Sequence, residues 1–156
     1  MDITFQNHNK QLPLTKKQIK NCIQLLFTEI GNKDFNKINM SIAFLSVKDI
    51  RALNLKYREV DKSTNILAFP ELSPIDFNSN SYLGDLAICL SVVQKEANIR
   101  SLKLSNHLFH IIIHGTLHLL GYDHHNEIKA GIMENIEISI LEKLKITNPY
   151  QEIIED

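Results

Sequence analysis

The feature that most constrains this chain is the segment 101–120, which predicts one long helix. From residue 108 onward the segment is almost entirely apolar apart from its histidines. At about 100° per residue, the histidines fall on one side of the predicted helix: His107, His110, His114 and His118. A helix that is apolar on its other faces is a buried helix. We therefore expect this segment to lie in the interior, with its histidines in a row.

The spacing of three histidines predicts a metal site at the end of this helix. His114 and His118 are one helical turn apart, and Gly121 permits the positive φ that turns the chain back, so His124 can supply a third nitrogen. A buried imidazole without a partner costs a few kcal/mol, and coordination removes that cost. Three neutral imidazoles are typical of catalytic zinc, because the fourth position stays open.

For several residues near these histidines the sequence leaves more than one role possible. A single histidine in a buried helix is more often a hydrogen-bonded core residue, and we expect His107 and His110 to support the ligands or line a groove. His125 competes with His124 because the two are adjacent, but the Gly121 turn presents His124 first. Asp123 is expected to orient one of the ligand histidines.

The rest of the chain predicts one α/β (α+β) domain over residues 1–156, with a small mixed sheet packed against several helices. With 156 residues and 44% hydrophobic residues, the chain is long enough for one core. Strands are expected around residues 3–5 and over 38–44, 66–70 and 83–90, with a loop at 71–81. A first helix is expected to open at the capping-box pattern Thr15-x-x-Gln18 and to end before Gly31, and a second opens at Ser46-x-x-Asp49 and carries residues 50–57. Further helices are expected over 91–98, 101–120 and 127–145, with a loose tail at 150–156.

Composition sets limits on location and partners. The first ten residues contain no basic or apolar signal stretch and no segment has the length of a membrane span, so the cytoplasm is expected. Cys22 and Cys89 stand alone and are expected to be buried small hydrophobic residues. A net charge of -1 provides no general basic field, so any RNA must be held locally.

The histidine and glycine spacing matches the metzincin peptidases, H-E-x-x-H-x-x-G-x-x-H, with one difference. The glutamate that would serve as general base is Gly115 here. A peptidase of that type would therefore lack its proton acceptor. A dipositive ion on neutral ligands attracts an anionic group, which favours a phosphodiester substrate.

The chain resembles the YbeY family of bacterial endoribonucleases and rRNA maturation factors. The resemblance is carried by three blocks that keep their order: Leu53-Asn54-x-x-Tyr57-Arg58 with Asp61-x-x-Thr64-Asn65-Ile66-Leu67-Ala68-Phe69-Pro70, then Gly84-Asp85-Leu86-Ala87-Ile88, and last His110-x3-His114-Gly115-x-Leu117-His118-Leu119-Leu120-Gly121-Tyr122-Asp123-His124. The chain departs from the family's common pattern at Asn65, where an aspartate is usual, and at Ala68, where a serine is usual.

The resemblance implies one zinc ion per chain on His114, His118 and His124. It also implies cleavage of single-stranded RNA in the 3' end maturation of 16S rRNA and in ribosome quality control. The partners implied are rRNA in the small ribosomal subunit and ribosomal proteins, with no membrane. Arg58 corresponds to the family's arginine near the metal and, with His114, is the predicted catalytic residue. Asp85 is expected to orient a ligand histidine, to line the RNA groove or to cap a loop.

Several alternatives stay open. The attacking group is a water or the ribose 2'-hydroxyl, and nickel or cobalt could replace zinc on three imidazoles. A ribosome assembly factor with a mainly structural zinc is a second function, and a residual peptidase is a third. RNA binding could also rely on five positive charges that are otherwise a solvated helix face: Lys48, Arg51, Lys56, Arg58 and Lys62.

Overall fold

The structure is a computed structural model that describes residues 1–71 and 81–151. Its elements follow in the order β1 (Asp2–Gln6), α1 (Lys16–Glu29), the 3-10 turn η1 (Phe35–Lys37), β2 (Ile38–Phe44), α2 (Val47–Arg58), β3 (Ile66–Pro70), β4 (Ser81–Ile88), α3 (Leu90–Ile99), α4 (Leu104–Leu119) and α5 (Glu127–Lys143). The predicted α/β fold with a small sheet is confirmed. No helix in the described part of the chain has the length and apolar character needed to cross a membrane.

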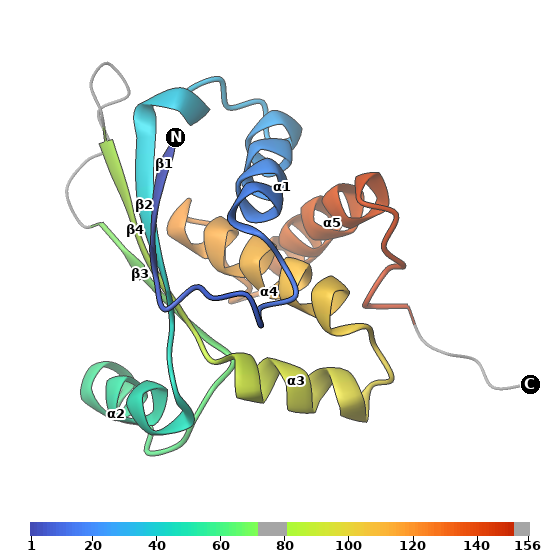
Figure 1. The fold of residues 1–156 in the computed structure, drawn as a ribbon. Coiled ribbons are helices and arrows are strands. Elements are labelled where there is room, and N and C mark those ends of the chain that lie inside the picture. The colour runs from blue at the N-terminus through green and yellow to red at the C-terminus, as the bar shows by residue number, and fades with distance from the viewer. Residues whose placement is uncertain (72–80, 152–156) are drawn as a thin grey trace, which may run out of the picture.

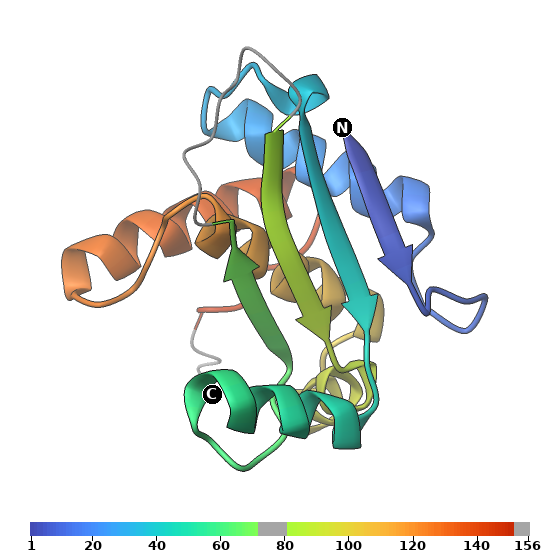
Figure 2. The same ribbon diagram turned by 90° about the vertical axis from the view of Figure 1, so that its left-hand side faces the viewer.

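The four strands form one mixed sheet in the order β1-β2-β4-β3 (Figure 2). β1, β2 and β4 run parallel, while β3 pairs with β4 in antiparallel register and forms one edge. The predicted alternation in β2 is confirmed, because every second residue from Ile38 to Phe44 is buried. That alternation gives the sheet one strongly apolar face.

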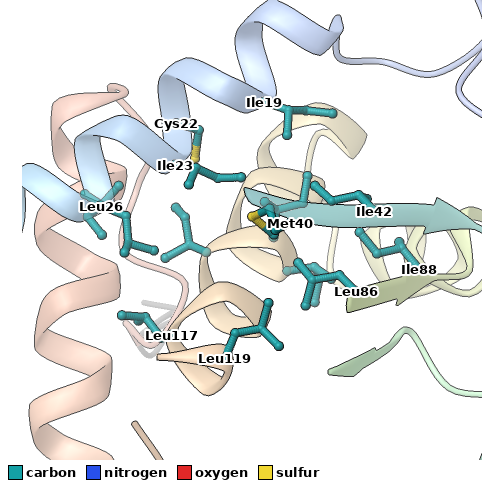
Figure 3. Packing of buried hydrophobic residues seen from close by; sticks show 14 of the residues in the cluster. Ile19, Cys22, Ile23, Leu26, Met40, Ile42, Leu86, Ile88, Leu117 and Leu119 are labelled. Atoms are coloured by element: carbon teal, nitrogen blue, oxygen red, sulfur yellow. The ribbon is translucent and has the colours of Figure 1, made fainter. Parts of the chain in front are cut away.

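The main core lies between this apolar face and the helices α1, α4 and α5 (Figures 1 and 3). The segment predicted to be buried is α4, which packs on β3 and β4 and also contacts α1, α3 and α5. A smaller cluster joins Ile50 of α2 to Leu67, Ala87 and Cys89 on the opposite face of the sheet. Both faces of the sheet near the start of β3 and the end of β4 are therefore covered.

Local signals place several helix ends where the sequence predicts them. Thr15 and Gln18 form the capping box at the start of α1, with Gln18 N donating to Thr15 Oγ1 at 3.1 Å. Ser46 caps α2 in the same way, through the backbone N–H of Asp49. Gly31 follows α1 with a φ of +72°. These signals are local hydrogen bonds and dihedral angles, so sequence alone can locate them.

Other boundaries differ from the prediction. Leu90 begins α3 instead of ending a strand, because β4 ends at Ile88. The long helix begins at Leu104 because Ser101, with a φ of +55°, lies outside the helical region. Residues 72–80 of the loop predicted at 71–81, and residues 152–156 of the predicted tail, lie outside the described residues, while Ser81 already belongs to β4.

Candidate metal centre and groove

The C-terminal end of α4 positions the third histidine through a tight turn. Gly121, with a φ of +97°, donates its N–H to the carbonyl of His118 at 3.0 Å. The N–H of Tyr122 donates to the carbonyl of Leu117 at 3.0 Å. This pair of bonds is a Schellman motif, which reverses the chain after the helix. The reversal brings His124 back toward the helix, as the sequence predicts.

His114, His118 and His124 form a group that could hold a metal ion, since one ligand atom from each lies within 4.8 Å of the others. The Nε2 atoms of His114 and His118 are 3.1 Å apart. Two nitrogens on one tetrahedral zinc would be separated by about 3.3 Å, given Zn–N bonds of 2.0–2.1 Å. The centroid of the His124 ring lies 5.7 Å from the centroid of the His114 ring and 5.1 Å from that of His118. The donor set and its spacing therefore fit a metal ion.

The environment of His118 favours a neutral ring with a free lone pair. Burial lowers the pKa of His118, and the nearby rings of His114 and His124 lower it further. A neutral imidazole is the form that coordinates a metal. Three converging histidines without an ion would repel one another when protonated, so the group is better suited to a metal than to three separate cations.

A buried glutamate that the sequence analysis missed, Glu137 of α5, lies behind the histidines. It is fully buried and accepts hydrogen bonds from His114 Nδ1 at 2.6 Å and His110 Nε2 at 3.0 Å. Burial alone would raise the pKa of Glu137, but hydrogen bonds from His110, His114 and Tyr150 outweigh it and lower the pKa to about 2. Glu137 is therefore an ionised carboxylate next to the candidate metal ligands.

A signal for Glu137 was present in the sequence. Glu137 shares the buried face of α5 with Met133, Ile140 and Leu141, at helical spacing. A charged residue in an apolar stripe is unlike the solvated glutamates on the other faces of the helix, because burial of an unpaired charge is costly. Its position in the sequence therefore predicts that Glu137 has a hydrogen-bond or charge partner in the core, although it does not identify that partner.

Tyr150 corrects the prediction of a loose tail beginning at residue 150. Its hydroxyl donates to Glu137, and its ring packs edge-on against His110 with centroids 5.4 Å apart. Arg100 Nη2 donates to the carbonyl of Pro149 at 2.9 Å and holds this segment to the end of α3. The prediction failed because it used local polarity, whereas the segment is ordered by contacts with residues distant in sequence.

His107 and His110 lie on α4 about two turns and one turn before His114, and both are buried. His107 Nε2 pairs with Glu96 at 3.0 Å, and Glu96 also accepts from Asn65 Nδ2 at 3.1 Å. Burial lowers the pKa of His107, while Glu96 opposes that change. Asn65, the departure from the family pattern, therefore serves as a donor to Glu96, a role that an ionised aspartate could not fill.

The three histidines of the candidate metal group line a groove of about 950 Å³. Tyr57 and Arg58 from the end of α2, Phe69 of β3 and Tyr150 share its lining with the three histidines. Tyr57 is 57% exposed and its ring lies edge-on to that of Phe69, with centroids 5.1 Å apart. The groove thus combines the candidate metal group, an arginine and an exposed aromatic ring.

Of the five predicted RNA-binding cations, Arg58 is the one that lines this groove among the described residues. Arg51 is held by Asp61, with Nε donating to Oδ1 at 2.8 Å. Lys56 lies over the ring of Tyr57, 5.2 Å from its centroid. The five predicted cations therefore do not form one surface at the groove: Arg58 lines it, and the other four lie outside its lining.

Asp85 does not lie with the histidines. It is exposed on β4, between buried Gly84 and Leu86, and accepts a hydrogen bond from the hydroxyl of Tyr82. Leu86 points into the main core beneath α4, so the alternation of side chains places Asp85 on the opposite face of the sheet. The expectation that Asp85 orients a ligand histidine or lines the groove is wrong.

Asp123 lines the groove but acts on the backbone. Its Oδ1 accepts the N–H of His125 at 3.1 Å, and this bond lowers the pKa of Asp123. Lys129 lies 3.6 Å from its other oxygen. Asp123 therefore shapes the turn that carries His124, and within the described residues it forms no hydrogen bond to a ligand ring.

Gly115 has a packing reason to be glycine. A Cβ at this position would contact the Ile66 side chain closer than normal van der Waals distance and would lie 3.0 Å from Leu86 Cδ2. The helix therefore approaches the sheet closely at the position where the metzincins carry their glutamate. A glutamate side chain here would point into β3 and β4 rather than toward the histidines.

The comparisons with known proteins agree with this architecture. A sequence model of the family described as Endoribonuclease YbeY matches residues 4–145. The chain belongs to the YbeY family. It is 42% identical over 146 residues to a protein named Endoribonuclease YbeY from Acinetobacter baumannii, covering 91% of each chain. Its identity to the protein of the same name from Colwellia psychrerythraea is 40%, covering 88% of each chain.

A third relative and one solved structure extend the agreement. Endoribonuclease YbeY from Francisella tularensis is 36% identical over 157 residues, with 97% of this chain and 90% of the relative covered. The solution structure of TM1509 from Thermotoga maritima matches with a TM-score of 0.58 and 20% identity, over 96% of this chain and 99% of that one. The latter likeness supports the fold. The resemblance of the sequence blocks to the YbeY family is thus confirmed.

Proposed function

We propose that this YbeY-family chain is a zinc-dependent endoribonuclease that cuts single-stranded RNA. We further propose that it acts in the cytoplasm, in 3' end maturation of 16S rRNA and in ribosome quality control, with the small subunit and its proteins as partners. The observation that carries the proposal is one groove in which His114, His118 and His124 converge beside Arg58. The relatives' name, Endoribonuclease YbeY, supports RNA as the substrate.

The three histidines would hold the metal through neutral imidazole nitrogens. Zinc is the ion best suited to three imidazoles with one open position, and nickel or cobalt would be competitors. When bound, the ion supplies a Lewis acid that neutralises charge on a phosphodiester. His114 would serve the reaction as a ligand, since its Nδ1 is occupied by Glu137 and its Nε2 faces His118.

Arg58 would bind the phosphate. A guanidinium remains charged at every physiological pH and can donate two parallel hydrogen bonds to phosphate oxygens. Arg58 ends α2, lines the groove and is exposed, and within residues 1–71 and 81–151 it has no ion-pair partner of the kind that Arg51 has in Asp61. The neighbouring Tyr57 offers an exposed ring on which a base of single-stranded RNA can stack.

Replacing Arg58 with alanine is expected to slow cleavage of a single-stranded RNA by about 10²- to 10³-fold, because a positioned donor to the reacting phosphate is lost. Metal content is expected to stay at the parental level, since Arg58 is outside the histidine group. Arg58→Lys should recover part of the rate, because it restores the charge without the two-pronged geometry. Cleavage rates and metal content of purified proteins test this.

The matched control is Arg51→Ala on the same helix. Arg51 lies outside the groove lining and pairs with Asp61 at the surface, so its removal should change cleavage by no more than about twofold. Parental cleavage by Arg58→Ala would contradict the role of Arg58. Equal losses of cleavage in both variants would show instead that the positive charge of α2 as a whole, and not Arg58 in particular, supports the reaction.

Metal removal distinguishes this function from an assembly factor with a mainly structural zinc. We expect a chelator to abolish RNA cleavage while the circular dichroism spectrum stays native, because the core is built from apolar contacts among α1, α4 and the sheet. Stoichiometric zinc should restore cleavage. Cleavage by metal-free protein, or unfolding on chelation, would favour the structural role.

The remaining candidate, a residual peptidase, needs a separate assay. We expect no peptide cleavage with metal present, because Gly115 stands where a metzincin carries its general-base glutamate.

A further inference from the structure

Three side chains meet at Glu137, and the chemistry of that carboxylate determines what each of them must do. Oε1 of Glu137 faces His114 Nδ1, and Oε2 faces both His110 Nε2 and the Tyr150 hydroxyl. An ionised carboxylate only accepts hydrogen bonds. All three partners are therefore donors, and the 2.6 Å contact places a proton of His114 on Nδ1. In a neutral ring this leaves the lone pair on Nε2.

The orientation of His114 follows from this. Its Nε2 faces the Nε2 of His118 at 3.1 Å, within the group that could hold a metal. The tautomer set by Glu137 is thus the one that presents a lone pair to the ion. His110 is restrained in the same way, since its Nδ1 is buried with no hydrogen-bond partner in the described part of the chain and its Nε2 donates to Glu137.

Charge also requires a partner for Glu137. It is fully buried, yet among the residues that the structure describes it is paired with histidines and a tyrosine, and with no lysine or arginine. A buried carboxylate without a cation is costly. A dipositive ion on the far side of His114 would supply the missing positive charge, with the imidazole lying between the ion and the carboxylate.

We propose that Glu137 and Tyr150 are positioning residues of the metal centre, which hold His114 in its metal-binding tautomer and supply the charge that balances the ion. Tyr150 is brought to the site by the segment after α5, which Arg100 holds through the carbonyl of Pro149. The centre therefore extends from the histidine motif to a residue near the C-terminal end of the described chain. The proposal rests on the three histidines being the ligands, as proposed above.

Zinc affinity of the purified full chain, measured by chelator competition, tests the proposal. Glu137→Gln, which keeps the shape but removes the charge, is expected to weaken zinc binding by about 10- to 100-fold. Tyr150→Phe, which removes one hydroxyl, is expected to weaken it by roughly three- to tenfold. The second variant is mild enough to fold if the first does not.

Glu96→Gln is the matched control. Glu96 makes the same kind of bond to a histidine of α4, with His107 Nε2 at 3.0 Å, but within the described part of the chain it forms no hydrogen bond to any of the three ligands. Its replacement should leave zinc affinity within about twofold of the parental value. A general loss of helix packing would affect both glutamate variants, whereas a positioning role affects Glu137 alone.

Nitrogen NMR of the metal-free protein gives a readout independent of both zinc and RNA cleavage. The proposal predicts that His114 is protonated on Nδ1 in the parental protein and loses this preference in Glu137→Gln. Unchanged zinc affinity in both Glu137→Gln and Tyr150→Phe would overturn the proposal. Parental protein that binds no metal would overturn it together with the metal site, while metal binding without RNA cleavage would overturn only the proposed function.

Discussion

His124→Ala is expected to abolish stoichiometric metal binding and RNA cleavage, whereas His125→Ala should preserve both. His124 supplies the third nitrogen of the group, and two imidazoles one helical turn apart form a much weaker site. The loss in metal affinity should exceed the roughly 100-fold cost typical of losing a residue that only supports a ligand. Metal analysis of the purified proteins and cleavage of a single-stranded RNA measure the two effects.

His125 is a close control because it is adjacent in sequence and also lines the groove. Its backbone N–H is bound by Asp123, and its ring is outside the group of three. A change at His125 therefore leaves the backbone bond intact and removes only a ring outside that group. Metal loss in His125→Ala, with retention in His124→Ala, would show that the turn presents the other histidine.

Gly84→Ala should produce the largest loss of folding stability. Gly84 has a φ of +143°, which side chains rarely adopt, and a Cβ there would collide with the backbone carbonyl oxygen of Phe69. It would also lie 3.0 Å from both Pro70 Cα and Leu119 Cδ2. We expect the free energy of unfolding to fall by about 2–4 kcal/mol, since backbone strain and a backbone collision add.

Gly131→Ala is the control for Gly84. Gly131 lies in α5, and nothing is within 4 Å of a Cβ built on it. The same chemical change should raise the free energy of unfolding by about 0.5–1 kcal/mol through helix propensity. Urea unfolding followed by circular dichroism compares the two. Equal effects would contradict the idea that close approach of β3 to β4 is what requires glycine at position 84.

The histidine group could be predicted because its geometry is local. His114 and His118 are four residues apart on one helix, and the Gly121 turn brings His124 back within the next few residues. Helical periodicity and a positive-φ glycine fix such distances without knowledge of the remaining fold. The burial of α4 was predictable for a similar reason, since an apolar helix surface must be covered.

Asp85 shows where this reasoning fails. Its place in a strand was evident, but which face of the sheet α4 would cover was not, and alternation then decides whether a side chain meets the helix. The same uncertainty applies to the cations of α2. Arg51 and Arg58 both lie on that helix, yet Asp61 holds one while the groove is lined by the other.

The sequence by itself determined the three histidines, the buried helix and the turn, because each depends on residues close together along the chain. Only the tertiary structure decided what surrounds them. Glu137 lies 23 residues from His114, and their contact exists because α5 packs beside α4 (Figure 1). Tyr150 lies 40 residues from His110 and reaches it because Arg100 holds the segment after α5. Charge balance around a metal centre depends on such long-range packing, since the interaction of a buried charge is set by distance in space and not in sequence.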